Sequence, residues 1–100
     1  MAMMCGGTGA VQDATPEVQK MCDEVKKSAE QKAGREFSVF RAKKFTSQVV
    51  AGTNYFVKVH VGGEEDVHLR LYKPLPHAGD KLELHGIQTA KTCHDPIGYF

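Results

Sequence analysis

Apolar residues recur every three or four positions along residues 15–34, which is the spacing of one face of a helix. Thr15 can cap the start of such a helix, Pro16 suits its first turn, and Gly34 is the kind of residue that ends one. Charged side chains fill the opposite face. The pattern predicts one amphipathic helix over residues 15–34, whose apolar stripe consists of Val18, Met21, Cys22, Val25 and Ala29.

Beyond the helix, apolar and polar residues alternate with the period of two that is typical of β-strands. The alternation predicts a long first strand that begins at Phe37 and whose phase slips near residues 41–44, as a β-bulge would cause. Further strands are predicted at residues 55–61, 67–72 and 82–88. One helix packed on one face of a meander of four antiparallel strands is an α+β fold.

Two turns of this meander have an unusual composition. The turns at residues 48–53 and 75–80 are alternate turns, so both emerge at the same end of the sheet. The first begins QVVAG and the second LPHAG, whereas most hairpin turns are built from polar residues, Gly or Pro. Adjacent strand residues point to opposite faces, so Val49 and Val50 cannot both enter the core under the helix. We therefore expect an exposed apolar edge, which usually marks a protein-binding site.

A purely structural interpretation of these two turns is also open. Val49 and Val50 could fold back over the end of the core, and Pro74 and Pro76 could simply end strands. Against this interpretation, a single helix covers only one face of the sheet, so at least one valine is expected to stay exposed beside a second apolar turn.

The composition restricts the class of protein. The chain has 100 residues, of which 41% are hydrophobic and 25% charged, with a formal net charge of +1. We expect one domain over residues 1–100, with a flexible Gly-rich N-terminal trunk at residues 1–14. The near-neutral balance argues against nucleic acid as a partner, and no apolar run is long enough for a membrane span.

The three cysteines and the start of the sequence suggest a cellular compartment. The segment MAMMCGGTGA has neither the basic nor the apolar region of a signal peptide. Three cysteines cannot all pair within one chain, so reduced thiols are expected. We therefore expect a cytoplasmic protein that is not secreted through a signal peptide, with the nucleus also open.

The segment QVVAGTNYFVKV closely resembles the signature of the cystatins, a family of inhibitors of papain-like cysteine proteases. The likeness extends from MMCGG through TPEVQKMCDEVK and VHLRLYKPLPH to the final YF, so it covers the whole chain. The lack of a signal peptide, of a disulfide framework and of tryptophan is similar to the cytosolic stefin branch of that family. The chain departs from the family pattern in Gly7, Cys22, Cys93 and Pro96.

The resemblance implies a reversible, tight-binding and non-covalent inhibitor that fills the protease cleft with a wedge of three segments. The implied contact residues are Met4, Cys5 and Gly6 in the trunk, Gln48, Val49, Val50, Ala51 and Gly52 in a first loop, and Leu75, Pro76 and His77 in a second loop. The implied partners are papain and cathepsins L, S, H and B, bound by a monomer. No catalytic residue, metal or cofactor is expected.

A second function, from a different class, stays open: a thiol-based redox or scaffold protein that acts through Cys5, which could also link two chains as a disulfide dimer. Cys93 and His94 make a poor nucleophile–base pair, because adjacent strand residues face opposite ways. The sequence contains neither a Cys-x-x-Cys nor a His-x-x-x-His pair that would suggest zinc.

The remaining histidines and cysteines have structural interpretations. Cys22 lies on the apolar stripe of the helix and is expected in the core. His60 and His68 flank the central hairpin, and we expect them on a solvated face of the sheet, where they could face each other across strands.

Overall fold

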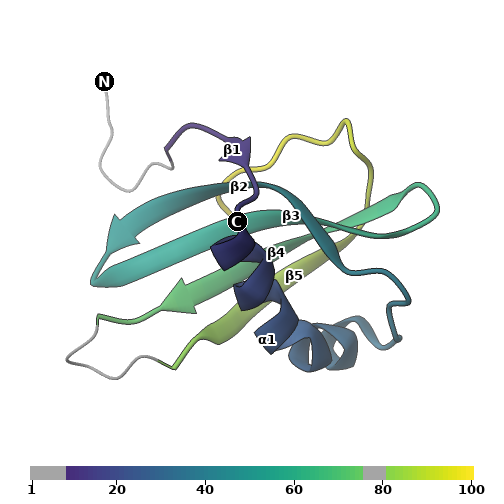
Figure 1. The fold of residues 1–100 in the computed structure, drawn as a ribbon, viewed down its shortest axis with the longest axis horizontal. Helices are drawn as coiled ribbons and strands as arrows, with labels where there is room; N and C mark the ends of the chain where they lie inside the picture. Colours follow the sequence, from purple (N-terminus) through teal and green to yellow (C-terminus); the bar gives the residue numbers. More distant parts are fainter. Residues whose placement is uncertain (1–8, 76–80) are drawn as a thin grey trace.

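The computed structural model describes residues 9–75 and 81–100. Within these residues the chain forms one helix and a five-stranded antiparallel sheet in chain order (Figure 1). The elements are β1 (Gln12–Asp13), α1 (Pro16–Ala33), β2 (Arg41–Val50), β3 (Gly52–Gly62), β4 (Glu65–Lys73) and β5 (Glu83–Lys91). The predicted α+β fold and the predicted meander are confirmed, with the short β1 as an added strand.

The helix α1 begins and ends at the predicted residues. The Thr15 side chain accepts a hydrogen bond from the backbone amide of Val18 at 3.2 Å, and Gly34 ends the helix in the left-handed conformation with φ 75°. The helical stripe packs against the sheet, with Met21 partly buried and its other members buried, and Cys22 is fully buried as predicted. Among the described residues, no helix has the length and apolar character that a membrane crossing requires.

The first long strand starts later than predicted. β2 begins at Arg41, not at Phe37, and its register shifts between Ala42 and Lys44, which confirms the predicted bulge. The segment before it belongs to the core without being a strand. The backbone amide of Phe37 donates to the carboxylate of Glu30 at 2.9 Å, so the helix holds the backbone of this segment.

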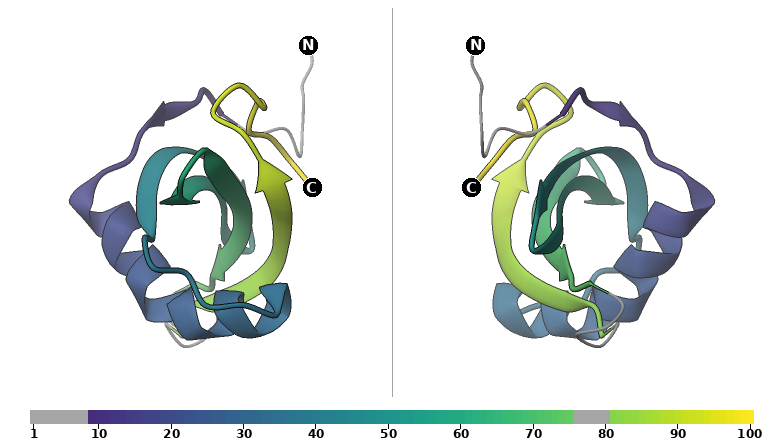
Figure 2. Two further views of the ribbon diagram at one scale, coloured as in Figure 1. Left: turned by 90° about the vertical axis from the view of Figure 1, so that its right-hand side faces the viewer. Right: turned by 90° about the vertical axis from the view of Figure 1, so that its left-hand side faces the viewer.

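Both faces of the sheet are covered. The sheet wraps around α1, which packs against its inner face (Figure 2). The side chains of β3 and β4 that meet the helix are Val57, Val59, Val61, Val67, Leu69 and Leu71. The expectation that one helix leaves the second face uncovered is wrong, because residues 92–100 lie over that outer face. There, Phe56 is fully buried, with its ring 5.5 Å from that of Tyr99 and 5.9 Å from that of Phe100.

The topology places the β2–β3 turn and the facing ends of β4 and β5 at one end of the sheet. Val50 lies opposite Gly52 at the β2–β3 turn, and Tyr72 lies opposite Glu83 near the β4–β5 connection. The β3–β4 turn, at residues 63–64, lies at the other end (Figure 1). The β2–β3 turn and the end of β4 therefore lie at one end of the sheet, as predicted, whereas residues 76–80 of the second turn lie outside the described residues.

Candidate functional site

The end of the sheet at the β2–β3 turn exposes apolar side chains. Val49 is 82% exposed and Val50 is 43% exposed, and Ala51, which alone separates the two strands, is exposed as well. Leu75, which follows β4, is 39% exposed at the same end. Three of the six large apolar side chains that are exposed among the described residues thus gather at this end. The structural interpretation, in which the valines fold back over the core, is wrong.

The tight β2–β3 turn depends on Gly52. Its φ of 113° lies in the region that side-chain-bearing residues rarely adopt. A Cβ atom on Gly52 would lie 2.6 Å from the backbone oxygen of Lys73 and 2.8 Å from the Tyr72 hydroxyl. The turn therefore sits directly against the end of β4, at a distance that only glycine permits.

Gln48 has a different environment from its neighbour Val49. It is 6% exposed, and its side-chain oxygen accepts a hydrogen bond from the Asn54 amide at 3.1 Å. Gln48 and Asn54 lie opposite each other in the β2–β3 ladder. The side chain of Gln48 therefore stabilises the β2–β3 hairpin next to its tip, which we define as residues 49–52. The two valines form the exposed apolar surface of that tip.

Sequence reasoning missed Tyr72 as a part of this site. Its hydroxyl donates a hydrogen bond to the backbone carbonyl of Ala51, and its ring stacks on that of His85 at 5.2 Å between centroids. A signal was present in the sequence: Tyr72 lies in the phase of β4 that faces away from the helix, just before the Pro74 break. Only the register shows that this position reaches the β2–β3 turn.

The described N-terminal residues run along β2 towards the same end. The backbone amide of Gly9 donates to the carbonyl of Ser47 at 2.9 Å, and the Thr46 hydroxyl donates to the carbonyl of Gly9 at 2.6 Å. Gly9 thus lies beside a residue that is only two positions from Val49. The predicted contact residues Met4, Cys5 and Gly6 of the trunk, and Pro76 and His77 of the second loop, lie outside the described residues.

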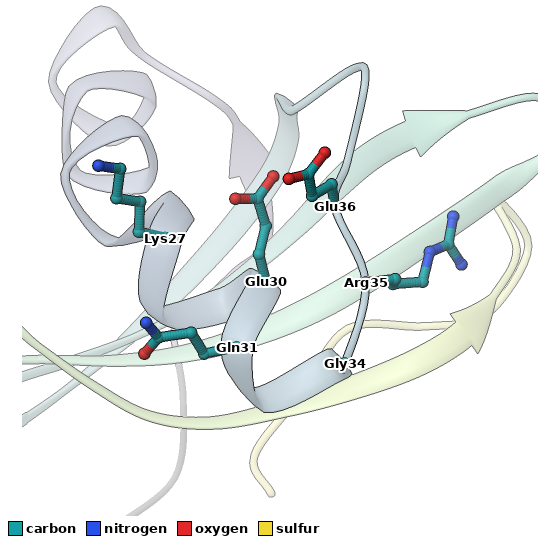
Figure 3. Close-up of a pocket in the computed structure, with 6 residues that line it drawn as sticks. All are labelled: Lys27, Glu30, Gln31, Gly34, Arg35 and Glu36. Carbon is teal, nitrogen blue, oxygen red and sulfur yellow. The ribbon is translucent and has the colours of Figure 1, made fainter.

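A polar hollow of about 420 Å³ lies near the C-terminal end of α1 (Figure 3). Its charged groups serve the fold: Glu30 holds the backbone of Phe37, and Arg35 points away from the other lining side chains and donates to Glu65 at 2.7 Å. The hydrogen bond from Arg35 lowers the pKa of Glu65. Because Glu65 begins β4 beside the β3–β4 turn, this hollow lies at the end of the sheet remote from the exposed valines.

The expectation of a solvated face is wrong for His68, whereas His60 is partly exposed, and the two histidines do not lie opposite each other. His68 is only 1% exposed, and its register partner in β3 is Lys58, whereas His60 lies opposite Asp66. His60 Nδ1 lies 3.1 Å from Asp66 Oδ1. Burial is the largest influence on His68 and lowers its pKa to about 4, with a further lowering by the positive charge of Lys58. The alternating pattern placed both histidines in the polar phase, but residues 92–100 bury that face.

The cysteines in the described residues are both free thiols. Cys93 and His94 are exposed and lie in a turn after β5, so the expectation that they lie in a strand is wrong. Burial, and then the negative charge of Asp23, raise the pKa of the Cys22 thiol to about 12, which makes it a poor nucleophile. The described residues contain no group of three or more His, Cys, Asp or Glu side chains that could hold a metal ion.

Comparison with known proteins agrees with this architecture. A cystatin domain model matches residues 6–94 of the chain. The chain is 58% identical to cystatin-B of Oplegnathus fasciatus, over the full length of both proteins. It is 55% identical to cystatin-B of Paralichthys olivaceus and 52% identical to cystatin-B of Homo sapiens, in each case over 98% of this chain and all of the relative. The chain therefore belongs to the cystatin family.

Proposed function

We propose that this protein inhibits papain-like cysteine proteases reversibly, tightly and without covalent chemistry, by filling the active-site cleft with the wedge. Membership of the cystatin family supports cysteine protease inhibition and identifies the chain as an inhibitor, not an enzyme. The binding mode is the part that we add. The wedge consists of the trunk around Gly6, the first loop at residues 48–52 and the second loop at residues 75–77.

The observation that carries the proposal is the exposure of Val49 and Val50 on a turn whose backbone is held by a hydrogen bond from the Tyr72 hydroxyl. When a partner buries exposed apolar side chains at a strand end, the free energy of the complex falls, which favours binding. A tip that is already ordered loses little conformational entropy on binding, so most of the favourable free energy of burial contributes to affinity. We assign contact roles to Val49, Val50 and Ala51, and a role in holding the shape of the loop to Gln48 and Gly52.

The position of Gly9 supports the proposed role of the trunk. Gly6 precedes Gly9 by three residues, so their Cα atoms lie at most about 11 Å apart. Because Gly9 is bonded to Ser47, the residues Met4, Cys5 and Gly6 are within reach of the first loop. In the proposed complex, Gly6 lets the trunk backbone approach the cleft closely, and Met4 and Cys5 supply apolar contacts.

The second loop is proposed to touch the opposite rim of the cleft through Leu75, Pro76 and His77. Leu75 is exposed on the same side of the molecule as the valines, which supports this role. An interface of about 800 Å² on each partner is expected for such a complex. The proposed partners are papain and cathepsins L, S, H and B. The proposed inhibitor is a monomer of the cytoplasm, with the nucleus as an additional compartment.

A titration of papain activity tests the proposal. A fixed concentration of active enzyme is mixed with increasing protein, and residual cleavage of a small fluorogenic peptide is recorded. We expect activity to fall to zero near one equivalent, competitively with the peptide, while the added protein stays intact. Undiminished activity at about micromolar protein, or steady cleavage of the chain within residues 48–52, would contradict the proposal.

A further inference from the structure

We propose that Tyr72 is a positioning residue for inhibition: its hydroxyl holds the backbone carbonyl of Ala51 and so fixes the shape of the first loop. Tyr72 is not one of the contact residues that the resemblance implies, and it acts on the partner only through the loop. This inference rests on the proposed function, because it explains why the first loop is ready to bind.

The contact between Tyr72 and the tip involves both the hydroxyl and the ring. The hydroxyl donates to the oxygen of Ala51, which is the single residue between β2 and β3. A Cβ atom on Gly52 would lie 2.8 Å from that hydroxyl and 3.0 Å from ring atom Cε1. The backbone of the turn therefore rests directly on the edge of the tyrosine ring.

The ring of Tyr72 is itself held by the neighbouring strands. It stacks on the imidazole of His85, at 5.2 Å between centroids and 21° between planes. His85 Nε2 in turn lies 2.8 Å from the carboxylate of Glu83. In the sheet, Tyr72 lies between Asn54 of β3 and Glu83 of β5. The donor that holds Ala51 is thus placed by β4 and its two neighbours, and of these only β3 belongs to the β2–β3 hairpin.

The hydrogen bond matters because of where Ala51 lies. The peptide group between Ala51 and Gly52 follows the two exposed valines and precedes a glycine, whose backbone has unusual freedom. Without a partner for its carbonyl, this peptide can rotate, and the tip then samples shapes that do not match a cleft. A loop that occupies the binding shape for only a fraction of the time binds more weakly in inverse proportion to that fraction.

The test is the substitution Tyr72→Phe, which removes the hydroxyl and keeps the ring. Tyr55→Phe is the matched control, because Tyr55 lies in the same sheet and packs with Phe45 on the face that meets the helix. For each protein we would measure the inhibition constant against papain, the thermal midpoint, and the ¹⁵N relaxation of the Ala51 and Gly52 amides.

We expect Tyr72→Phe to raise the inhibition constant about three- to tenfold, the range that one lost hydrogen bond corresponds to. The thermal midpoint should fall by no more than about 8 °C, the shift that the loss of about 1 kcal/mol produces in a domain of this size. The Ala51 and Gly52 amides should become more mobile on the nanosecond timescale, and Tyr55→Phe should leave the inhibition constant and both amides unchanged.

Unchanged mobility of Ala51 and Gly52 in Tyr72→Phe would overturn the inference, and so would an unchanged inhibition constant alongside increased mobility. A control that weakens inhibition as much as Tyr72→Phe does would also overturn it, since the effect would then not be specific to the tip. If the parent protein does not inhibit papain at all, the proposed function fails separately. In that case the relaxation data alone still decide whether Tyr72 holds the turn.

Discussion

Gln48 and Val49 are adjacent in β2, yet Gln48 is 6% exposed and Val49 is 82% exposed. This reverses the usual distribution, in which the polar side chain faces water and the apolar one is buried. The reversal is stable because the buried amide has the Asn54 side chain as a partner. Because the Val49 side chain lies mostly in solvent, the stability of the fold does not depend on it. A substitution at this position can therefore separate an effect on binding from an effect on stability.

Replacing Val49 by serine should weaken inhibition and leave the fold intact. Burial of a valine side chain contributes about 1.5–3 kcal/mol, so its loss corresponds to about 10- to 150-fold in the inhibition constant. The free energy of unfolding should change by less than about 0.5 kcal/mol, because the side chain is exposed in the free protein. Papain inhibition and urea unfolding of the same preparation measure the two quantities.

Val39→Ser is the matched control for that experiment. Val39 is also an exposed valine, but it lies just before β2, at the opposite end of the sheet from Ala51. It should change neither inhibition nor stability. Equal weakening of inhibition by Val39→Ser and Val49→Ser would show that the apolar end of the sheet is not the binding surface.

Replacing Gly52 by alanine should damage both the turn and inhibition. The added Cβ would meet the backbone oxygen of Lys73 at 2.6 Å, and the positive φ adds strain. We expect a loss of about 1–3 kcal/mol in the free energy of unfolding, together with weaker papain inhibition. Gly98→Ala is the control, since nothing lies within 4 Å of a Cβ there. Parent-like stability of Gly52→Ala would mean that the turn is less tightly packed than described.

Removal of residues 1–7 should weaken inhibition through faster dissociation. The hydrogen bonds of Gly9 with β2 are retained, so the fold should stay intact. Loss of one or two apolar contacts corresponds to about 2–4 kcal/mol, or about 30- to 1,000-fold in affinity. Surface plasmon resonance against an immobilised protease gives the dissociation rate, and removal of Met1 and Ala2 alone serves as control. A parent-like dissociation rate would show that the trunk takes no part in binding.

Cys5→Ser should keep nearly all papain inhibition in the presence of reductant, because a wedge needs no covalent chemistry of its own. Without reductant, the parent protein is expected to form a dimer through Cys5 that inhibits less well, since linked trunks obstruct each other's entry into the cleft. The inhibition constants of both proteins, with and without reductant, decide between the two functions. Complete loss of inhibition by Cys5→Ser in reductant would favour the thiol-based function.

The buried His68 should make the protein less stable as the pH falls from about 6.5 towards 4. Burial lowers the pKa of His68 from 6.5 to about 4, with Lys58 and Lys91 acting in the same direction and Asp95 and Asp66 opposing them. In this pH range the unfolded chain binds a proton that the folded protein does not bind, so protonation favours unfolding. The expected slope is about 1.4 kcal/mol per pH unit from this one group.

Urea unfolding between pH 7.5 and 4.5 measures this dependence. His68→Gln should show a shallower loss of stability than the parent protein, whereas His94→Gln should follow the parent, because His94 is exposed. Parallel stability curves for His68→Gln and the parent protein would exclude His68 as the source.

The helix and the strand order could be predicted from the sequence because their signals are local. Thr15 and Gly34 bound α1 within the segment that they cap, and the alternation within β3 and β4 needs only neighbouring residues. The covering of the outer face could not be predicted in this way. Lys58 donates to the carbonyl of Thr92 at 2.9 Å across 34 positions of sequence. Phe56, an aromatic residue in the polar phase of β3, was a local signal that this face is buried.

The candidate site shows the same division. The exposure of at least one of Val49 and Val50 could be predicted, because two adjacent strand residues cannot share one face, but the exposure of both could not. The role of Tyr72 could not, because its hydroxyl meets Ala51 across 21 positions of sequence, at a point that only the register of three strands defines. Alternation assigns a residue to a face, but it does not say which turn that residue reaches.

The β3–β4 turn lies at the opposite end of the sheet from the apolar tip, so it is a suitable site for chemical attachment. Gly63 and Glu64 are exposed, and a Cβ on Gly63 would meet nothing within 4 Å. The longest dimension of the molecule is 36 Å, and β3 runs from this turn to the tip. A dye, a bead or a sensor surface attached at Glu64 would therefore leave the exposed valines of the β2–β3 turn directed into solution, where the proposed contact with a protease can form.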